Sequence, residues 1–115
     1  METLSKIPVT DSIYLKVNEV YCRYMYNEIL YIEASGSYCY IHLSNNSKIL
    51  LTTSLAELQD HLPIEIFIRT HRSFIVNINY IERILGNLIY IGEMAIPIGR
   101  ENKKEIFSRL NIVGL

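Results

Sequence analysis

The sequence has few cysteines, no long hydrophobic run and almost no net charge in its 115 residues. A helix needs roughly 20 consecutive apolar residues to cross a bilayer. The longest apolar stretches, such as residues 29–32, are interrupted within a few positions. The N-terminal residues also lack the charged and then apolar layout of a secretory signal. We therefore expect a cytoplasmic protein with no membrane span.

The two cysteines, Cys22 and Cys39, each lie in an apolar, tyrosine-rich stretch. Without a second pair of cysteines, they do not form the pattern of a zinc site or of a disulfide framework. We interpret both as packing residues, and we expect neither a metal nor a cofactor.

The net charge of −1 excludes a globally cationic surface, which is the usual first sign of a nucleic-acid-binding protein. The total conceals an asymmetry, because residues 1–60 hold four Lys or Arg against seven Asp or Glu, whereas residues 61–115 hold seven against five. A local basic patch in the second half is compatible with this distribution. Its candidate members are Arg69, Arg72, Arg100, Lys103, Lys104 and Arg109.

Half of the residues are hydrophobic, so a chain of this length can bury one core and form a single domain. Apolar and polar residues alternate in short segments, which is the pattern of half-buried strands. In the first half, this pattern predicts strands at 12–17, 21–26, 28–34, 38–43 and 48–53. Turns at 18–19 and 44–47 make this part an antiparallel meander. In the second half, strands are predicted at 65–69, 73–77, 80–85, 88–91 and 94–98, with tight turns at Gly86-Asn87 and Gly92-Glu93.

A short helix is predicted between the two halves, where Ser54 can cap it, Glu57 can reach back to complete a capping box, and Pro63 ends it. Its apolar face consists of Leu55, Leu58 and Leu62. The opposite face carries Glu57, Gln59 and Asp60, the wrong sign for DNA, so we interpret the helix as a connector. A second helix follows Gly99, because Ile106, Phe107 and Leu110 have helical spacing. The pattern predicts a mainly β fold with about ten short strands, one short central helix and a short C-terminal helix.

An enzyme would have to be built from a set of dispersed polar residues. None of their spacings forms a metal-binding pair on a helix, a nucleophile elbow or a glycine-rich phosphate loop. The sequence therefore predicts a protein that is not an enzyme. The residues considered are His42, His61, His71, Glu33, Glu65 and Ser73.

The segment RTHRSFIVN, residues 69–77, places basic side chains directly before an apolar strand. Arg69 is predicted to end one strand and Ser73 to begin the next, so the residues between them are expected to be exposed. A guanidinium on such a rigid mount loses little conformational freedom on binding, and its planar fork can hold a guanine edge or a phosphate. In the alternative interpretation, Arg69 pairs with an acid such as Glu65 and His71 fills a polar core position. The residues alone leave both open.

Four blocks of the sequence resemble the LytTR-type DNA-binding domain, the output module of many bacterial response regulators. The most specific block has the form FxRxHRSFxVN followed by IxxI. The blocks are EILYIEASGSYCYIHL (28–43), TTSLAELQDHL (52–62), FIRTHRSFIVNINYIERI (67–84) and IPIGRENKKEI (96–106). The resemblance covers a core of about residues 12–112 within one domain, residues 1–115. It implies small antiparallel sheets arranged as an elongated β-β-β sandwich, which binds DNA through loops instead of a recognition helix.

The resemblance also implies the function. Such a domain is a sequence-specific, double-stranded DNA-binding module of a bacterial transcriptional regulator. Three loops on one face would reach two successive major grooves and the minor groove between them, with two copies side by side on promoter direct repeats. We predict base contacts from Ser37, Tyr38, Arg72 and Arg100. We predict phosphate contacts from Arg69, His71, Asn102, Lys103 and Lys104.

Some signature residues are assigned to architecture instead. Asn77 is predicted to tie a turn to its neighbour, and Glu33 to orient the amides of the first loop. For His71, a phosphate contact and a core role remain open. Gly99 stands where Ser is common in the family, and it lets the backbone in front of Arg100 approach DNA closely.

The alternative function is a β-rich protein interaction module without nucleic-acid binding. The acidic balance favours it, because tyrosine-rich strand edges can dock a partner strand. Family members are usually joined to a receiver domain, and we find none in these residues. The sequence is compatible with a free-standing regulator and with a fragment of a longer one.

Overall fold

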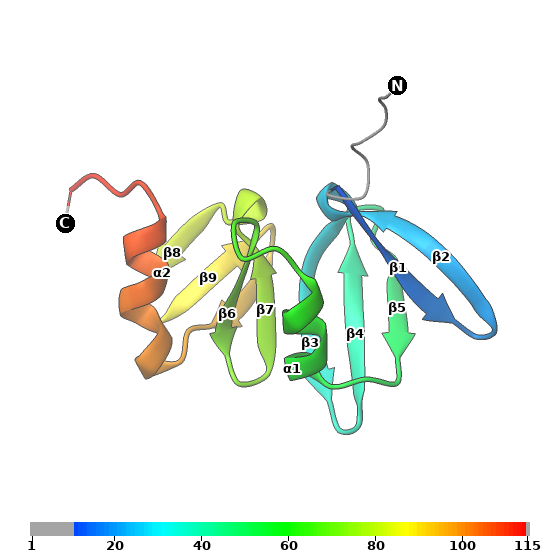
Figure 1. Ribbon diagram of the computed structural model, residues 1–115. Helices are drawn as coiled ribbons and strands as arrows, with labels where there is room; N and C mark the ends of the chain where they lie inside the picture. The colour runs from blue at the N-terminus through cyan, green and yellow to red at the C-terminus, as the bar shows by residue number, and fades with distance from the viewer. Residues whose placement is uncertain (1–10, 115) are drawn as a thin grey trace.

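The computed structural model describes residues 11–114, which form three small antiparallel sheets side by side (Figure 1). The central sheet has the strand order β5 (Lys48–Leu51), β4 (Tyr38–Leu43), β3 (Ile29–Ser35), β7 (Phe74–Asn77) and β6 (Phe67–His71). At one end lies the hairpin of β1 (Ser12–Val17) and β2 (Val20–Met25). At the other lies a sheet of β8 (Arg83–Leu85), β9 (Leu88–Ile91) and β10 (Met94–Pro97). The molecule is elongated, with extents of 47 × 38 × 24 Å.

Two α-helices complete the fold, so the predicted mainly β architecture with a central and a C-terminal helix is confirmed. Helix α1 (Leu55–His61) connects β5 to β6, and α2 (Lys103–Arg109) follows β10. Three single 3-10 turns lie at η3 (Tyr26–Glu28), η4 (Ile78–Tyr80) and η5 (Arg100–Asn102). No helix in the described part of the chain is long and apolar enough to cross a membrane.

The β3, β7 and β6 part of the central sheet is buried on both faces, whereas β5 exposes Lys48 and Leu50 on one of them. Alternate residues of β7 divide between two hydrophobic clusters, with Ile75 in one and Val76 in the other. The first cluster packs β3, β4 and β5 against α1 and the β1–β2 hairpin, and the second packs β6 and β7 against β9, β10 and α2. Because side chains alternate across a strand, a sheet between two clusters needs apolar residues at successive positions.

The N-terminus of α1 follows half of the predicted capping box. The hydroxyl of Ser54 accepts a hydrogen bond from the Glu57 backbone N–H at 3.0 Å, as predicted. The Glu57 carboxylate, however, accepts from the Thr53 hydroxyl at 2.9 Å. Leu55, Leu58 and Leu62 are buried, so the predicted apolar face is confirmed.

Several predicted strand boundaries were wrong, and turns explain the shifts. The segment predicted at 65–69 begins instead at Phe67, because the Pro63 carbonyl accepts from the N–H groups of Ile66 and Phe67 and holds a turn there. The segment predicted at 80–85 begins at Arg83, because Asn77 caps the preceding 3-10 turn. The strand predicted at 48–53 ends at Leu51.

The two cysteines are free thiols. Cys39 is fully buried and donates to the Thr53 carbonyl at 3.3 Å, which confirms a packing role. Burial raises the pKa of the Cys39 thiol, and the nearby Arg69 guanidinium opposes that rise. Cys22 is half-buried in β2. Among the described residues, no group of three or more His, Cys, Asp or Glu side chains could hold a metal ion.

Candidate nucleic-acid interface

Three connections that are far apart in the sequence lie along the lower edge of the molecule in Figure 1. They are the β3–β4 turn at 36–37, the β6–β7 turn at 72–73, and the segment 99–102 that leads into α2. These connections contain or adjoin the residues predicted to contact bases. Ser37, Tyr38, Arg72 and Arg100 are all exposed. The structure thus brings the predicted base-contacting residues to one edge.

The β3–β4 turn is fixed by Gly36 and closed by the pairing of Ser35 with Tyr38. Gly36 has a φ of +60°, a conformation that costs little only for glycine. Ser37 therefore stands at the tip, and Tyr38 begins the returning strand with 46% of its surface exposed. The strand pairing that closes the turn holds the backbone of Ser37 and Tyr38 in place without a ligand.

Glu33 does not act as predicted. Its carboxylate pairs with His42 Nε2 at 3.0 Å on β4, instead of orienting the amides of the turn. The reason is its register: Glu33 pairs with Tyr40, so its side chain points to the same face of the sheet as that of His42 two residues away. His42 also stacks on Tyr31, with ring centroids 4.2 Å apart. This pair belongs to the face of the sheet and lies away from the turn.

The β6–β7 hairpin contains a bulge that the sequence did not reveal. Arg69 pairs with Ile75 and His71 pairs with Phe74, so Thr70 is an extra residue on β6. Thr70 is completely buried, and the prediction that the residues between Arg69 and Ser73 are exposed was wrong at this position. The bulge turns Thr70 into the core. Arg72 remains at the exposed tip.

Side chains of the hairpin hold its own turn. His71 Nδ1 accepts from the Ser73 backbone N–H at 3.1 Å. The Arg69 guanidinium donates to the carbonyls of His71 and Arg72 at 2.9 and 2.8 Å, and to Gln59 Oε1 of α1 at 2.7 Å. Neither interpretation from the sequence predicted these partners of Arg69. The expected partner was the carboxylate of Glu65, whereas the observed acceptors are the Gln59 amide oxygen and two backbone carbonyls.

The segment in front of α2 is bonded to that same hairpin. The Gly99 N–H donates to the Thr70 carbonyl at 2.6 Å, and the Gly99 carbonyl accepts from the Asn102 N–H at 2.9 Å. Gly99 has an ordinary φ of −66°, so the backbone itself does not require glycine. A Cβ at this position would lie 2.7 Å from Asn102 Oδ1, so a larger residue would make the Asn102 side chain move.

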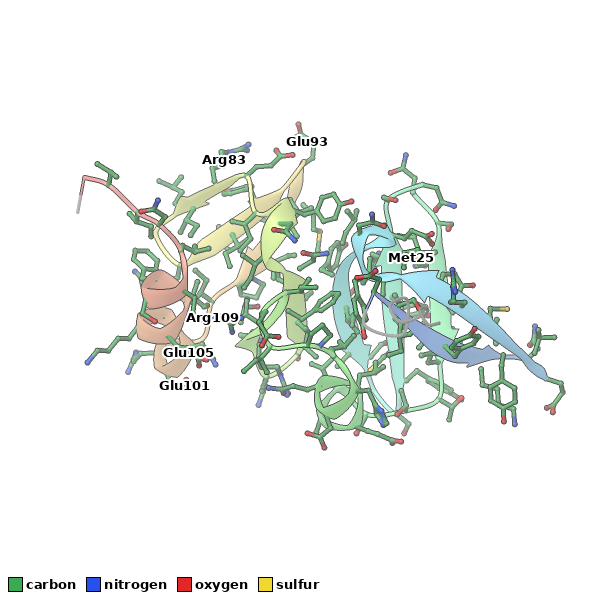
Figure 2. All side chains as sticks on the ribbon, turned by 45° about the horizontal axis from the view of Figure 1, so that its top comes forward. Met25, Arg83, Glu93, Glu101, Glu105 and Arg109 are labelled. Carbon is green, nitrogen blue, oxygen red and sulfur yellow. The ribbon has the colours of Figure 1, made fainter. Side chains whose placement is uncertain are left out.

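The basic residues around α2 differ in how they are held. Lys103 donates to Asn87 Oδ1 at 3.0 Å, whereas Lys104 is exposed. Arg109 lies at the other end of α2, where its Nη1 is 3.9 Å from Glu105 Oε2 (Figure 2). Lys103 and Lys104, which begin α2, therefore lie nearer than Arg109 to the edge that the three turns share.

Asn77 acts as predicted, in the architecture of the domain. It is completely buried, and its amide group donates to the carbonyls of Tyr26 and Ile29 at 3.1 and 2.9 Å. Its Oδ1 accepts from the Asn79 N–H at 2.9 Å. These bonds connect the end of β7 to the segment that enters β3.

Comparison with known proteins decides the family. The family model of the LytTr DNA-binding domain matches residues 19–111, which is most of the chain. The chain belongs to the LytTR family of DNA-binding domains. Among solved structures, it is similar to the LytTr DNA-binding domain of a protein described as a methyl-accepting/DNA response regulator from Bacillus cereus. That similarity has a TM-score of 0.74 and 25% sequence identity, and it covers 89% of this chain and 98% of the other. No curated protein sequence matches the chain.

Membership of the LytTR family confirms the resemblance seen in the sequence and makes the chain a DNA-binding domain. It supports DNA binding over the alternative, an interaction module without nucleic-acid binding. In this LytTR domain, the exposed turns on one edge are the segments that are predicted to contact bases. The family is one of DNA-binding domains and not of enzymes.

Proposed function

We propose that this LytTR domain belongs to a bacterial transcriptional regulator and reads promoter direct repeats in double-stranded DNA. The three turns of the edge enter successive major grooves and the minor groove between them, and a second copy binds the adjacent repeat. The observation that carries the proposal is the common edge shared by the Gly36, Arg72 and Arg100 segments.

The dimensions of the molecule support this arrangement. Its longest extent is 47 Å, whereas one helical turn of B-DNA is about 34 Å long. A domain lying along the duplex is therefore long enough to face two successive major grooves. Helix α1 is unsuited to entering a groove, because it exposes Glu57 and Asp60, whose carboxylates repel phosphates.

Within this proposal, the four exposed residues of the turns contact base edges. Arg72 and Arg100 each present a guanidinium whose planar fork matches the acceptors of guanine in the major groove. Ser37 and Tyr38 offer hydroxyl groups at the tip of the β3–β4 hairpin. The rigid backbone of each turn lowers the conformational entropy lost on binding.

Phosphate contacts supply most of the affinity and its dependence on salt. We assign them to His71, Asn102, Lys103 and Lys104. His71 is prepared for this role: because its Nδ1 accepts from Ser73, the neutral ring carries its proton on Nε2, which then donates to an acceptor outside the hairpin. Arg69 was also predicted to bind a phosphate, but three of its N–H groups already donate to acceptors of the protein.

Selection of bound sequences from a random pool of double-stranded DNA tests the proposal. We expect an enriched motif that occurs twice in the same orientation, together with an affinity that falls steeply between two salt concentrations. A pool that shows no enrichment, or binding that does not respond to salt, would contradict it.

A further inference from the structure

Arg69 is one of the two arginines in the RTHRS segment, yet its surroundings differ from those of Arg72. Arg72 is exposed at the tip of the hairpin, whereas Arg69 is half-buried in β6. Three of the five N–H groups of the Arg69 guanidinium donate to acceptors of the protein. A guanidinium that mainly binds DNA would keep its donors free for the DNA. The donors of Arg69 are mostly used within the protein, so its main role must be a different one.

Two of these acceptors are the backbone carbonyls of the turn itself. Arg69 Nε donates to the His71 carbonyl at 2.9 Å and Nη2 donates to the Arg72 carbonyl at 2.8 Å. The planar fork thus spans successive peptide groups and fixes their relative orientation. Hydrogen bonds from a charged donor are about twice as strong as neutral ones. They hold the residues that determine where the Arg72 side chain leaves the backbone.

The bulge explains why the turn needs such support. In a regular hairpin, the ladder of backbone hydrogen bonds continues up to the turn. Here the register shifts between Arg69 and His71, so the regular pairing is interrupted just before the tip. The guanidinium of Arg69 and the ring of His71 replace the missing restraints by binding backbone groups of residues 71–73.

The third acceptor connects the hairpin to the rest of the domain. Arg69 Nη1 donates to Gln59 Oε1 at 2.7 Å, and Gln59 lies on α1 next to the buried Leu58. Because α1 packs against the central sheet, this bond fixes the guanidinium from a second direction. The turn is then positioned relative to α1 as well as to β6.

From these contacts, we infer that Arg69 is a positioning residue, which sets the direction of the Arg72 side chain for base reading and does not serve mainly as a phosphate contact. The inference rests on the proposed function, since Arg72 must read a base for its direction to matter. The two roles of Arg69 differ in consequence. A phosphate contact adds affinity for any sequence, whereas a positioning residue changes the preference among sequences.

Arg69→Lys is the decisive variant, because it keeps the charge and removes the planar fork. Using the motif selected by the wild-type domain, we expect Arg69→Lys and Arg69→Met to lower discrimination at the base pair read by Arg72 by about tenfold each. The slope of log affinity against log salt should stay unchanged in both. Lys104→Met is the matched control, for which we expect that slope to fall by about 0.9 with discrimination retained.

A double-mutant cycle links the effect to Arg72. In an Arg72→Ala background, Arg69→Lys should cause no further loss of discrimination at that base pair. The inference is overturned if Arg69→Lys retains the wild-type preference, if Arg69→Met lowers the salt slope like Lys104→Met, or if the two losses are additive. Gln59→Ala, at an exposed position, gives a milder variant in case Arg69 substitutions unfold the domain, and it should lower the same discrimination by a smaller factor.

Hydrogen exchange of the DNA-free domain tests the positioning role separately from the function. In the wild type, we expect the Arg69 Nε–H and the Ser73 backbone N–H to exchange slowly, and Arg69→Lys to accelerate exchange at Ser73. Exchange at Arg69 as fast as at Arg72 would overturn the inference. If the wild-type domain selects no DNA sequence, the proposed function fails, while this measurement still reports whether Arg69 holds the turn.

Discussion

The backbone N–H of Gly99 donates to the carbonyl of Thr70 at 2.6 Å. This bond joins the hairpin that carries Arg72 to the segment that carries Arg100. Thr70 reaches Gly99 because the bulge in β6 directs its peptide group away from regular pairing with β7. The backbone segments that carry the two arginines proposed to read bases are therefore joined by a hydrogen bond before DNA binds.

Replacing Arg100 by alanine should abolish the preference for the selected site and leave the melting temperature nearly unchanged. Arg100 is exposed, and its contribution to discrimination should be about 1 to 3 kcal/mol if it makes a bidentate base contact. Competition between the selected site and a scrambled site measures the preference, and thermal melting measures stability.

Arg83→Ala is the control for this variant. Arg83 is also exposed, but it lies over the Tyr90 ring at 4.4 Å and stands at the top of the molecule in Figure 2, away from the start of α2. We expect it to keep the site preference. An equal loss in both variants would mean that Arg100 acts only through net charge.

Substituting Gly36 by alanine should weaken both stability and site preference. At a φ of +60°, a Cβ costs roughly 1 to 2 kcal/mol, because it approaches the following carbonyl oxygen. The turn can relieve this strain only by moving Ser37 and Tyr38. Denaturant unfolding and DNA competition on the same variant measure the two effects.

Gly92→Ala provides a matched control, since Gly92 has a φ of +59° in the β9–β10 turn. Its neighbour Glu93 lies at the top of Figure 2, far from the three turns. The loss of stability should be similar, whereas the site preference should persist. If both variants lose the preference equally, strain anywhere in the domain is sufficient and the Gly36 turn has no special role.

Gly99→Ala is expected to cost less than about 1 kcal/mol of stability, because the backbone conformation suits any residue and the crowding atom belongs to a movable side chain. The new Cβ would displace the Asn102 carboxamide, which lies 2.7 Å from its position. The affinity for DNA should therefore fall as much as in Asn102→Ala. A double variant should lose no more than either single one, and additive losses would disprove this coupling.

Thr70→Val should raise the free energy of unfolding by about 1 kcal/mol, because the buried Thr70 hydroxyl has no hydrogen-bond partner and valine has nearly the same shape. The backbone bond to Gly99 remains, so DNA binding should not change. Thr53→Val serves as the control, since the Thr53 hydroxyl donates to Glu57 and its removal should give no gain. Chemical denaturation compares the two.

Asn77→Ala should destabilise the domain by about 3 kcal/mol, because it leaves two carbonyls without their donor in a buried site. Asn45→Ala, in an exposed turn where Asn45 accepts from Ser47, should cost under about 1 kcal/mol. Urea unfolding distinguishes them. A small effect at Asn77 would show that water can replace its amide group.

Local patterns in the sequence predicted most elements of the fold. Strands with clear alternation, such as 38–43 and 88–91, agree with β4 and β9 residue for residue. Strand boundaries next to Pro63 and Asn77 were wrong, because hydrogen bonds specific to those turns compete with the continuation of a strand. Alternation predicts which residues suit a strand. It does not predict which backbone groups form the hydrogen bonds of a turn instead of those of the sheet.

The DNA-contacting residues of the candidate site stay a prediction, and the structure agrees only partly with how their surroundings were expected to be arranged. The RTHRS segment was singled out from its residue types and Arg100 from the family resemblance, and Asn77 was assigned to architecture correctly. Thr70 was expected to be exposed and is buried, and Glu33 binds His42 instead of the turn amides. Both errors concern strand register, which depends on the partner strand and on the bulge.

The sequence by itself determined the alternating strands, the capped helix, the glycine turns and the family, since each of these depends on residues close together in the chain. Only the tertiary structure decided that Arg69 binds the carbonyls of its own turn while Arg72 faces outward, and that Gly99 is joined to Thr70. The physical reason is that a backbone N–H or a guanidinium can satisfy many acceptors. Which acceptor it meets is fixed by the packing of distant segments around two cores.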